Sequence, residues 1–363
     1  MHFLKHKRKK NNNGRIFYAV QATGNGHISR AIELIPYLSQ YAPVDVFLSG
    51  NNSHLQAQLP VVYRSKGLSL FYGKKGGLHY GKMWQELNIN NVIKEAKNLP
   101  VDEYAYVIND FESITSLACK LKNKPSVGFG HQASFQSANT PRPKNKNWIG
   151  EHILKNYAAC SAYVGLHFHN YDNFIYQPII KSNLLNANPC SQQHITVYLS
   201  HYSNQVIKQH LLNIPEILFE VFSKEVNNIV QEKNIIWKPI NNEAFTQSLL
   251  NCSGVITGAG FETPAEALYL GKKLLCLPIK GQYEQLCNAA ALEKWGVTIL
   301  PTIDTDFSWQ IKQWVASVNP KKLVLQNQTY QIVQSVMEKA KNLLTAGDNI
   351  PTIENTQSPL LWG

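Results

Sequence analysis

The sequence has no apolar run long enough to cross a bilayer and no closely spaced pair of cysteines. A membrane-spanning helix needs about 20 apolar residues, and no stretch of the 363 residues approaches that length. The six cysteines form no Cys-x-x-Cys pair, and Cys252 and Cys276 fall in expected strands as small core residues. This pattern favours a reducing compartment. The apolar segment 16–20 is short for a signal sequence, so we expect a cytoplasmic protein.

Charged residues are also few, at 16% of the chain against 44% hydrophobic residues, which is typical of a globular protein. Acidic residues are scarcer than basic ones, and the formal net charge is +11. This balance favours an anionic partner: nucleic acid, an acidic membrane surface or a phosphorylated small molecule. Residues 1–14 combine lysines with asparagines and are expected to form a basic flexible tail.

Short apolar runs alternate with helical patterns in two consecutive sets, and the length suffices for two domains with full cores. The runs at 16–20 and 195–199 look like the starts of two comparable halves. We expect an α/β protein with two Rossmann-like, doubly wound domains that face each other across a cleft. The predicted divisions are an N-terminal domain at 15–181, a linker at 182–194, a C-terminal domain at 195–346 and an irregular tail at 347–363. The apolar stripe near 332–343 predicts a last helix, for which packing against the N-terminal domain is one option.

Polar or glycine-rich turns follow several expected strands, at the edge where doubly wound sheets bind ligands. They are Gly24-Asn25-Gly26-His27, Asp110, His131, Ser200-His201 and Gly258-Ala259-Gly260. Neither glycine turn completes a dinucleotide-binding fingerprint, because Ser29 and Thr263 occupy the third glycine position. This disfavours a nicotinamide or flavin enzyme.

The most informative stretch is 254–296. A β-branched run ends on the Gly258 corner, Thr263 and Glu266 have the spacing of a capping box with Pro264 at the first helical position, and Gly271 closes the helix. A glycine corner at a helix N-terminus presents free backbone N–H groups and a partial positive charge to an anion. A diphosphate is the expected anion.

At this point the sequence resembles a known family. Eight residues of this stretch have the order and spacing seen in the C-terminal half of GT-B glycosyltransferases, and they most resemble the family of peptidoglycan N-acetylglucosaminyltransferases (glycosyltransferase family 28). They are Gly260, Thr263, Glu266, Gly271, Pro278, Gln285, Asn288 and Ala289. The N-terminal Gly24-x-Gly26-His27 resembles that family's glycine-rich loop. Asp110-Phe111-Glu112 is similar to a strand end in a less characterised group of such transferases. The turn Ser200-His201-Tyr202 departs from the family because it lacks glycine.

The resemblance implies a donor site for a UDP-sugar in the C-terminal domain. Gly258, Ala259, Gly260 and Phe261 would hold the diphosphate, Thr263 would also belong to the donor site, and backbone at 236–240 would read the nucleobase. Glu266 would accept hydrogen bonds from the ribose hydroxyls, since a carboxylate offers only acceptors; its alternative role is to complete the capping box. Gln285 and Glu284 would face the sugar, whereas Asn288 is expected to begin a helix.

Transfer also needs a base for the acceptor hydroxyl. His27 at a helix N-terminus, where the helix field favours the neutral imidazole, is one candidate and Asp110 the other, each with a structural role as the alternative. The remaining residues expected at the acceptor or cleft are Gly24, Asn25, Gly26, His131, Ser200 and His201. His167 and His169 are expected on one face of a strand as a structural pair, and we expect neither a metal nor a cofactor. Lys272 and Lys273 are expected to be solvated.

The resulting hypothesis is an inverting, metal-independent hexosyltransferase. It would move a hexose or N-acetylhexosamine from a UDP-sugar, UDP-GlcNAc above all, to a lipid-linked or cell-envelope glycan in polysaccharide biosynthesis. A nucleotide-sugar epimerase of the same fold and a non-catalytic sugar-nucleotide binding protein remain alternatives. A basic, aromatic loop at 66–84 and the lysines at 144–146 fit peripheral contact with the inner face of the plasma membrane. Nucleic acid is not expected as a partner.

Overall fold

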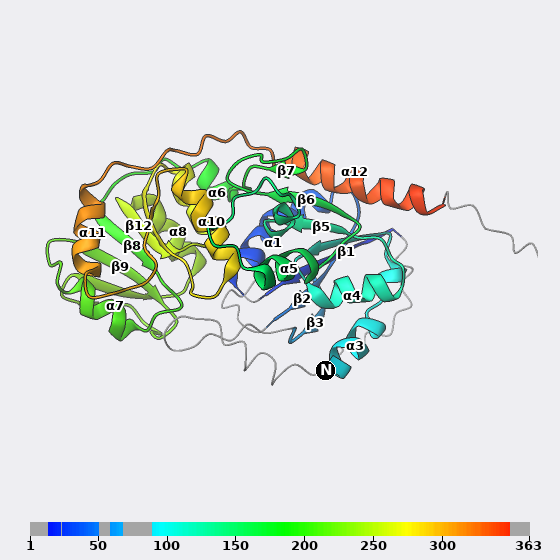
Figure 1. The fold of residues 1–363 in the computed structure, drawn as a ribbon, viewed down its shortest axis with the longest axis horizontal. Coiled ribbons are helices and arrows are strands. Elements are labelled where there is room, and N and C mark those ends of the chain that lie inside the picture. Colours follow the sequence, from blue (N-terminus) through cyan, green and yellow to red (C-terminus); the bar gives the residue numbers. More distant parts are fainter. Residues whose placement is uncertain (1–13, 23, 51–58, 68–88, 349–363) are drawn as a thin grey trace, which may run out of the picture.

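The computed structural model describes residues 14–22, 24–50, 59–67 and 89–348. Within these ranges the chain forms two seven-stranded sheets, each at the centre of its own domain (Figure 1). Most of the predicted basic, aromatic loop and nearly all of both predicted tails lie outside the described residues. The predicted α/β class with two Rossmann-like domains is confirmed.

The first sheet is wholly parallel and has the order β3-β2-β1-β4-β5-β6-β7. Its strands are β1 (Ile16–Gln21), β2 (Val44–Ser49), β3 (Val61–Ser65), β4 (Tyr106–Asp110), β5 (Val127–Gly130), β6 (Ala162–Leu166) and β7 (Ile175–Tyr176). Its helices are α1 (Asn25–Leu38), α3 (Ile89–Asn98), α4 (Ser113–Leu121) and α5 (Trp148–Asn156), with 3-10 turns η1 (Val101–Glu103) and η2 (Gln132–Gln136). All six residues of β1 are buried, as expected for a central parallel strand covered on both faces.

The second sheet has the order β10-β11-β9-β8-β12-β13-β14 and is parallel except for β10. Its strands are β8 (His194–Tyr198), β9 (Leu218–Ser223), β10 (Val230–Glu232), β11 (Ile235–Pro239), β12 (Gly254–Gly258), β13 (Lys273–Leu277) and β14 (Thr298–Ile299). Its helices are α7 (Asn204–Leu211), α8 (Asn242–Asn251), α9 (Glu262–Tyr269), α10 (Tyr283–Glu293) and α11 (Phe307–Ala316), and the short α6 (Ser182–Leu185) lies in the crossover from the first domain. In both sheets the first strand lies beside the point where strand order reverses, which places ligand sites at these carboxyl edges.

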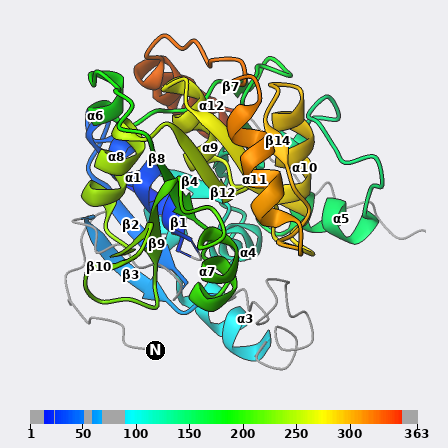
Figure 2. The same ribbon diagram turned by 90° about the vertical axis from the view of Figure 1, so that its left-hand side faces the viewer.

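The last helix, α12 (Thr329–Asp348), returns to the first domain and packs against α1, β4, β5 and β6 (Figure 1). Its predicted apolar stripe is buried at Ile332, Val336 and Ala340. In Figure 2 the second domain faces the viewer, and α5 lies at the edge of the molecule beside α10. No helix within the described ranges is both long and apolar enough to span a membrane.

Two local predictions are wrong. Strand β6 ends at Leu166 and is followed by β7, so His167 is buried while His169 is exposed, and the two do not share a strand face. Helix α1 contains Pro36 and ends two residues later, at Leu38. Lys272 is not solvated.

The ammonium group of Lys272 donates to the carbonyls of Cys190, Leu250 and Cys252 at 2.6, 2.7 and 2.8 Å. The Nζ of Lys273 donates to the carbonyl of Val315, at the end of α11, at 2.8 Å. Each lysine therefore binds backbone carbonyl groups near the end of a helix. A cation is favourable there because the last carbonyl groups of a helix carry partial negative charge. The pair ties elements of the second domain together.

Candidate active-site cleft

A cleft of about 490 Å3 is lined by residues of both domains that follow the strands β1, β4, β5, β8, β12 and β13. The predicted site residues that line it are Gly24, Asn25, Gly26, His27, His131, Ser200, His201, Gly258, Gly260, Phe261, Thr263, Glu284 and Gln285. Asp110 and Ala259 lie behind this wall, both fully buried. Glu266 lines a neighbouring pocket. The structure thus gathers turns that are up to about 260 residues apart along the chain, because carboxyl ends of parallel strands share one edge.

The glycine corner opens toward the cleft. A Cβ placed on Gly260 would have no atom within 4 Å, so this backbone is accessible to a ligand. The preceding Ala259 is fixed from behind, where its carbonyl accepts a hydrogen bond from the Asn288 amide at 3.1 Å. Helix α9 begins directly after the corner and points its N-terminus into the cleft, which suits an anion.

The predicted capping box is wrong. Helix α9 begins at Glu262 and Phe261 precedes it, with no side-chain cap, so Thr263 is already helical. Pro264 then stands third in the helix, where its missing N–H group has no intrahelical partner to lose. The carboxylate of Glu266 is consequently free of a capping role and forms an ion pair with Lys181, at 3.1 Å between Nζ and Oε1.

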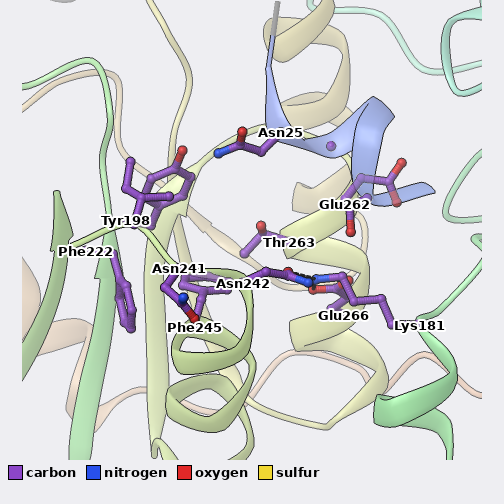
Figure 3. Close-up of a pocket in the computed structure, with 13 residues that line it drawn as sticks. Asn25, Lys181, Tyr198, Phe222, Asn241, Asn242, Phe245, Glu262, Thr263 and Glu266 are labelled. Carbon is purple, nitrogen blue, oxygen red and sulfur yellow. Dashed lines mark hydrogen bonds and ion pairs between the residues drawn. The ribbon is translucent and has the colours of Figure 1, made fainter. Parts of the chain in front are cut away.

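Glu266 and Lys181 lie on one side of a smaller pocket of about 70 Å3 beside the cleft (Figure 3). Its other walls are aromatic or amide side chains: Tyr198, Phe222, Phe245, Asn241 and Asn242. Lys181 Nζ also lies 3.3 Å from the Oδ1 of Asn242. Lys181 was not predicted, because it belongs to the crossover between the domains and only the fold brings it to Glu266.

His27 and Asp110, predicted as alternative bases, are partners. His27 is in the first turn of α1 and Asp110 is the last residue of β4, and their Nδ1 and Oδ1 atoms lie 2.8 Å apart. Because the carboxylate only accepts, Nδ1 carries the shared proton. The other nitrogen, Nε2, is left with a lone pair at the cleft, 3.4 Å from the amide nitrogen of Gln132. This is the tautomer that a general base needs.

Arg30 completes this arrangement and was not predicted. Its Nη2 lies 2.7 and 2.9 Å from the two carboxylate oxygens of Asp110 and 3.1 Å from the Nδ1 of His27. Burial raises the pKa of Asp110, but the Arg30 charge and the hydrogen bonds from His27 and Arg30 outweigh it and hold that pKa below its ordinary value. The signal was present in the sequence, since Arg30 stands three residues after His27 and therefore shares its helix face.

His131 serves the contact between the domains. It is fully buried, its ring stacks on Phe261 with centroids 4.0 Å apart, and its Nε2 lies 2.7 Å from the Oδ1 of Asn288. Burial lowers the pKa of His131. Asn288 does not begin a helix as predicted; it is buried in the middle of α10, where one side of its amide meets His131 and the other Ala259.

The remaining predicted residues surround the glycine corner. Gln285 Oε1 accepts the backbone N–H of Ile279 at 2.9 Å, which fixes the loop after β13. Glu284 lies 3.9 Å from the His131 ring. In the turn after β8, the Nε2 of His201 is buried without a hydrogen-bond partner among the described residues, and burial lowers the pKa of His201 to about 4. Within the described ranges no group of three or more His, Cys, Asp or Glu side chains is arranged to hold a metal ion.

Two facing Rossmann-like domains with a cleft between their carboxyl edges are the arrangement of the GT-B fold. The family model of glycosyl transferase family 1 matches residues 14–318, and the chain belongs to this family. No functionally curated protein matches the chain.

Similar solved structures span nearly the whole chain at low identity. Arabidopsis thaliana UGT89C1 in complex with UDP is 14% identical, covers 90% of this chain and 94% of its own, and has a TM-score of 0.55. A UDP-glucosyltransferase from Polygonum tinctorium is 12% identical, with coverages of 93% and 95% and a TM-score of 0.54. Acinetobacter baumannii MurG is 13% identical, with coverages of 90% and 99% and a TM-score of 0.50. These likenesses concern the fold, and the specific resemblance to the peptidoglycan transferases is not confirmed.

Proposed function

We propose that the protein is an inverting glycosyltransferase that moves a hexose or N-acetylhexosamine from a UDP-sugar to a hydroxyl acceptor without a metal ion. The observation that carries the proposal is the His27–Asp110 pair on one wall of a cleft whose other wall is the Gly258–Phe261 corner. Relatives of the same fold support the donor class, since UGT89C1 has been solved with UDP and with UDP-L-rhamnose.

In this proposal the two pockets divide the donor. The backbone at 258–261 and the N-terminus of α9 hold the diphosphate and stabilise its charge as it leaves. Glu266 accepts hydrogen bonds from the ribose hydroxyls in the smaller pocket, and the nucleobase lies toward Tyr198 and Phe245, near the backbone of Ile240. The sugar then faces Glu284 and Gln285, and UDP-GlcNAc is the first donor to test.

The acceptor hydroxyl gives its proton to His27 Nε2 as its oxygen attacks the anomeric carbon. The bond from that carbon to the diphosphate oxygen breaks on the opposite face, so the configuration inverts and UDP leaves with the bonding pair. Asp110 does not touch substrate, because it is fully buried behind His27. It stabilises the imidazolium through the 2.8 Å contact with Nδ1. His27 is therefore the proposed base and Asp110 its partner.

The test begins with a thermal-shift screen of nucleotide sugars, since selective binding to the folded state raises apparent stability. UDP release is then measured with and without glycan and lipid-linked acceptors, and with EDTA. Acceptor-dependent release that survives EDTA supports the proposal. A changed sugar without any acceptor would indicate an epimerase, and selective binding without turnover would indicate a binding protein.

The acceptor remains a proposal as well: a lipid-linked or cell-envelope glycan at the inner face of the plasma membrane. Helix α5 supports it, because Trp148 is 79% exposed beside the exposed Ile149 and Ile153. Lysines at 144, 146 and 155 flank this face and are exposed. Each contributes roughly 1 kcal/mol near an anionic surface.

Co-sedimentation with vesicles that contain phosphatidylglycerol, at low salt, tests this face. Trp148→Ala should reduce binding, whereas Trp309→Ala, which removes a 62% exposed tryptophan from α11 in the other domain, should not. Equal binding by both variants would reject α5 as the membrane contact.

A further inference from the structure

One side chain from each domain meets at the wall of the cleft. Arg30 of α1 in the first domain forms an ion pair with Glu262, the first residue of α9 in the second. The same guanidinium, 2% exposed, holds both oxygens of Asp110. A single buried cation thus connects the glycine corner of the donor domain to the His27–Asp110 pair of the acceptor domain.

Two glycines leave room for this connection. A Cβ on Gly130 would lie 2.8 Å from an Asp110 oxygen and 2.9 Å from Arg30 Nη2, and the φ of Gly130, +128°, also disfavours other residues. A Cβ on Gly26 would lie 3.0 Å from the Glu262 Cγ. The backbone on both sides therefore approaches the charged groups as closely as it can.

We propose that Glu262 is a positioning residue that acts through Arg30: it holds the guanidinium against Asp110, and so completes the His27 base when the donor domain is docked. The inference rests on the proposed function, because it gives Glu262 a part in the same transfer. An acid beside a diphosphate site would otherwise be unfavourable, since like charges repel. Its ion pair with Arg30 offsets that repulsion.

This role predicts that donor affinity and turnover respond differently to loss of the Glu262 charge. Without the anion, a diphosphate meets less repulsion and binds as well or better. The Arg30 guanidinium, however, loses one of its two carboxylate partners and with it the geometry that orients Asp110 and His27. Turnover should therefore fall while the KM for donor does not rise.

The charged groups that face His27 are Asp110 on β4, Arg30 on α1 and Glu262 on α9. Tyr18 of β1 lies within their field and stays neutral, because burial raises its pKa well above its ordinary value. Among the described contacts Glu262 reaches His27 through Arg30. Replacing Arg30 should therefore remove the effect of replacing Glu262.

The first experiment measures kcat and the donor KM for Glu262→Gln, Arg30→Lys and the double variant. Glu216→Gln is the matched control, since Glu216 is a glutamate of the same domain in an exposed ion pair with Lys312. In Glu262→Gln we expect kcat to fall about tenfold or more while the KM for donor does not rise. The double variant should lose no more than Arg30→Lys alone. Unchanged kcat, a raised donor KM at constant kcat, or additive losses would overturn the inference.

The second experiment needs no substrate. The NMR spectra of isotope-labelled histidines are recorded at one pH in the wild type, Glu262→Gln and Glu216→Gln, with His27 assigned from its missing signal in His27→Asn. Changed ring signals of His27 in Glu262→Gln only are expected, because Arg30 no longer holds Asp110 in place, and unchanged signals would overturn the coupling even in an active transferase. If the signals change but the wild type transfers no sugar, the coupling is supported and the proposed function is rejected.

Discussion

The substitution Asp110→Asn should separate turnover from donor binding. It replaces a fully buried carboxylate that accepts from His27 at 2.8 Å and from Arg30 at 2.7 and 2.9 Å. An amide that keeps its oxygen toward His27 turns its N–H2 group toward the Arg30 guanidinium, so that two donors face each other. In the opposite orientation the amide donates to Nδ1, which moves the ring proton to Nε2 and removes the lone pair that receives the acceptor proton. In both orientations the His27 ring loses its charged partner. General-base catalysis contributes about 10²–10⁴-fold, and we expect a loss of that order in kcat.

The same variant should be less stable by a calculable amount. Removing one partner of a buried ion pair costs about 3–5 kcal/mol, and the lower end applies because Glu262 still neutralises Arg30. At roughly 2–4 °C per kcal/mol for a domain of this size, Tm should fall by about 6–12 °C.

Differential scanning fluorimetry measures that shift, and calorimetry at 15 °C, where the variant is folded, measures UDP affinity. We expect a Kd for UDP within about twofold of the wild type, because the donor corner is on the other domain. A variant that keeps more than a tenth of the wild-type kcat would refute the role of Asp110. A variant that loses UDP binding would refute the assignment of donor and base to opposite walls.

Three other predictions concern single side chains. Glu266→Gln should weaken UDP binding about tenfold or more by calorimetry, because an amide cannot accept from both ribose hydroxyls; Glu225→Gln is the control, and equal Kd values would reject the ribose contact. His201→Gln should make the free energy of unfolding, measured by urea titration at several pH values, fall less steeply as the pH is lowered. Burial holds the pKa of His201 at about 4, so unfolding takes up a proton below about 6.5, and up to about 3 kcal/mol is lost as pH falls from there to 4; an identical curve for the variant would contradict this. Gly130→Ala should lower both Tm and kcat, because its Cβ would displace the Asp110–Arg30 pair, whereas normal kcat would show that the pair tolerates displacement.

Much of the fold could be predicted because it follows from local patterns. Buried parallel strands appear as short apolar runs, and β1 and β12 were found in this way. The edge at which polar turns gather also follows from strand direction, so the cleft walls around Gly26 and Gly260 were expected. The errors arose where the boundary of an element decides a role: α9 begins two residues earlier than its proline suggested, and the cap at Thr263 disappears.

The ion pair between the domains could not be predicted, because Arg30 and Glu262 belong to different domains. Nothing near Glu262 in the sequence indicates Arg30. Lys272 was misjudged for the same reason, since the three carbonyls that it satisfies come from distant segments. A buried charge is recognisable only once its partners are placed around it.

The return of α12 means that the second domain is an insertion in the first domain. The chain leaves after β7, builds the whole second sheet and comes back to finish the first lobe with its longest helix. Both crossings lie on the body of the inserted lobe, where the N–H groups of Cys190 and Leu323 bind to the carbonyls of Leu250 and Leu268. Cutting the chain at the crossover would therefore leave the first domain without α12 and the second domain with α12 attached to it. Expressing the segment between these two anchors is instead the way to obtain the second domain by itself.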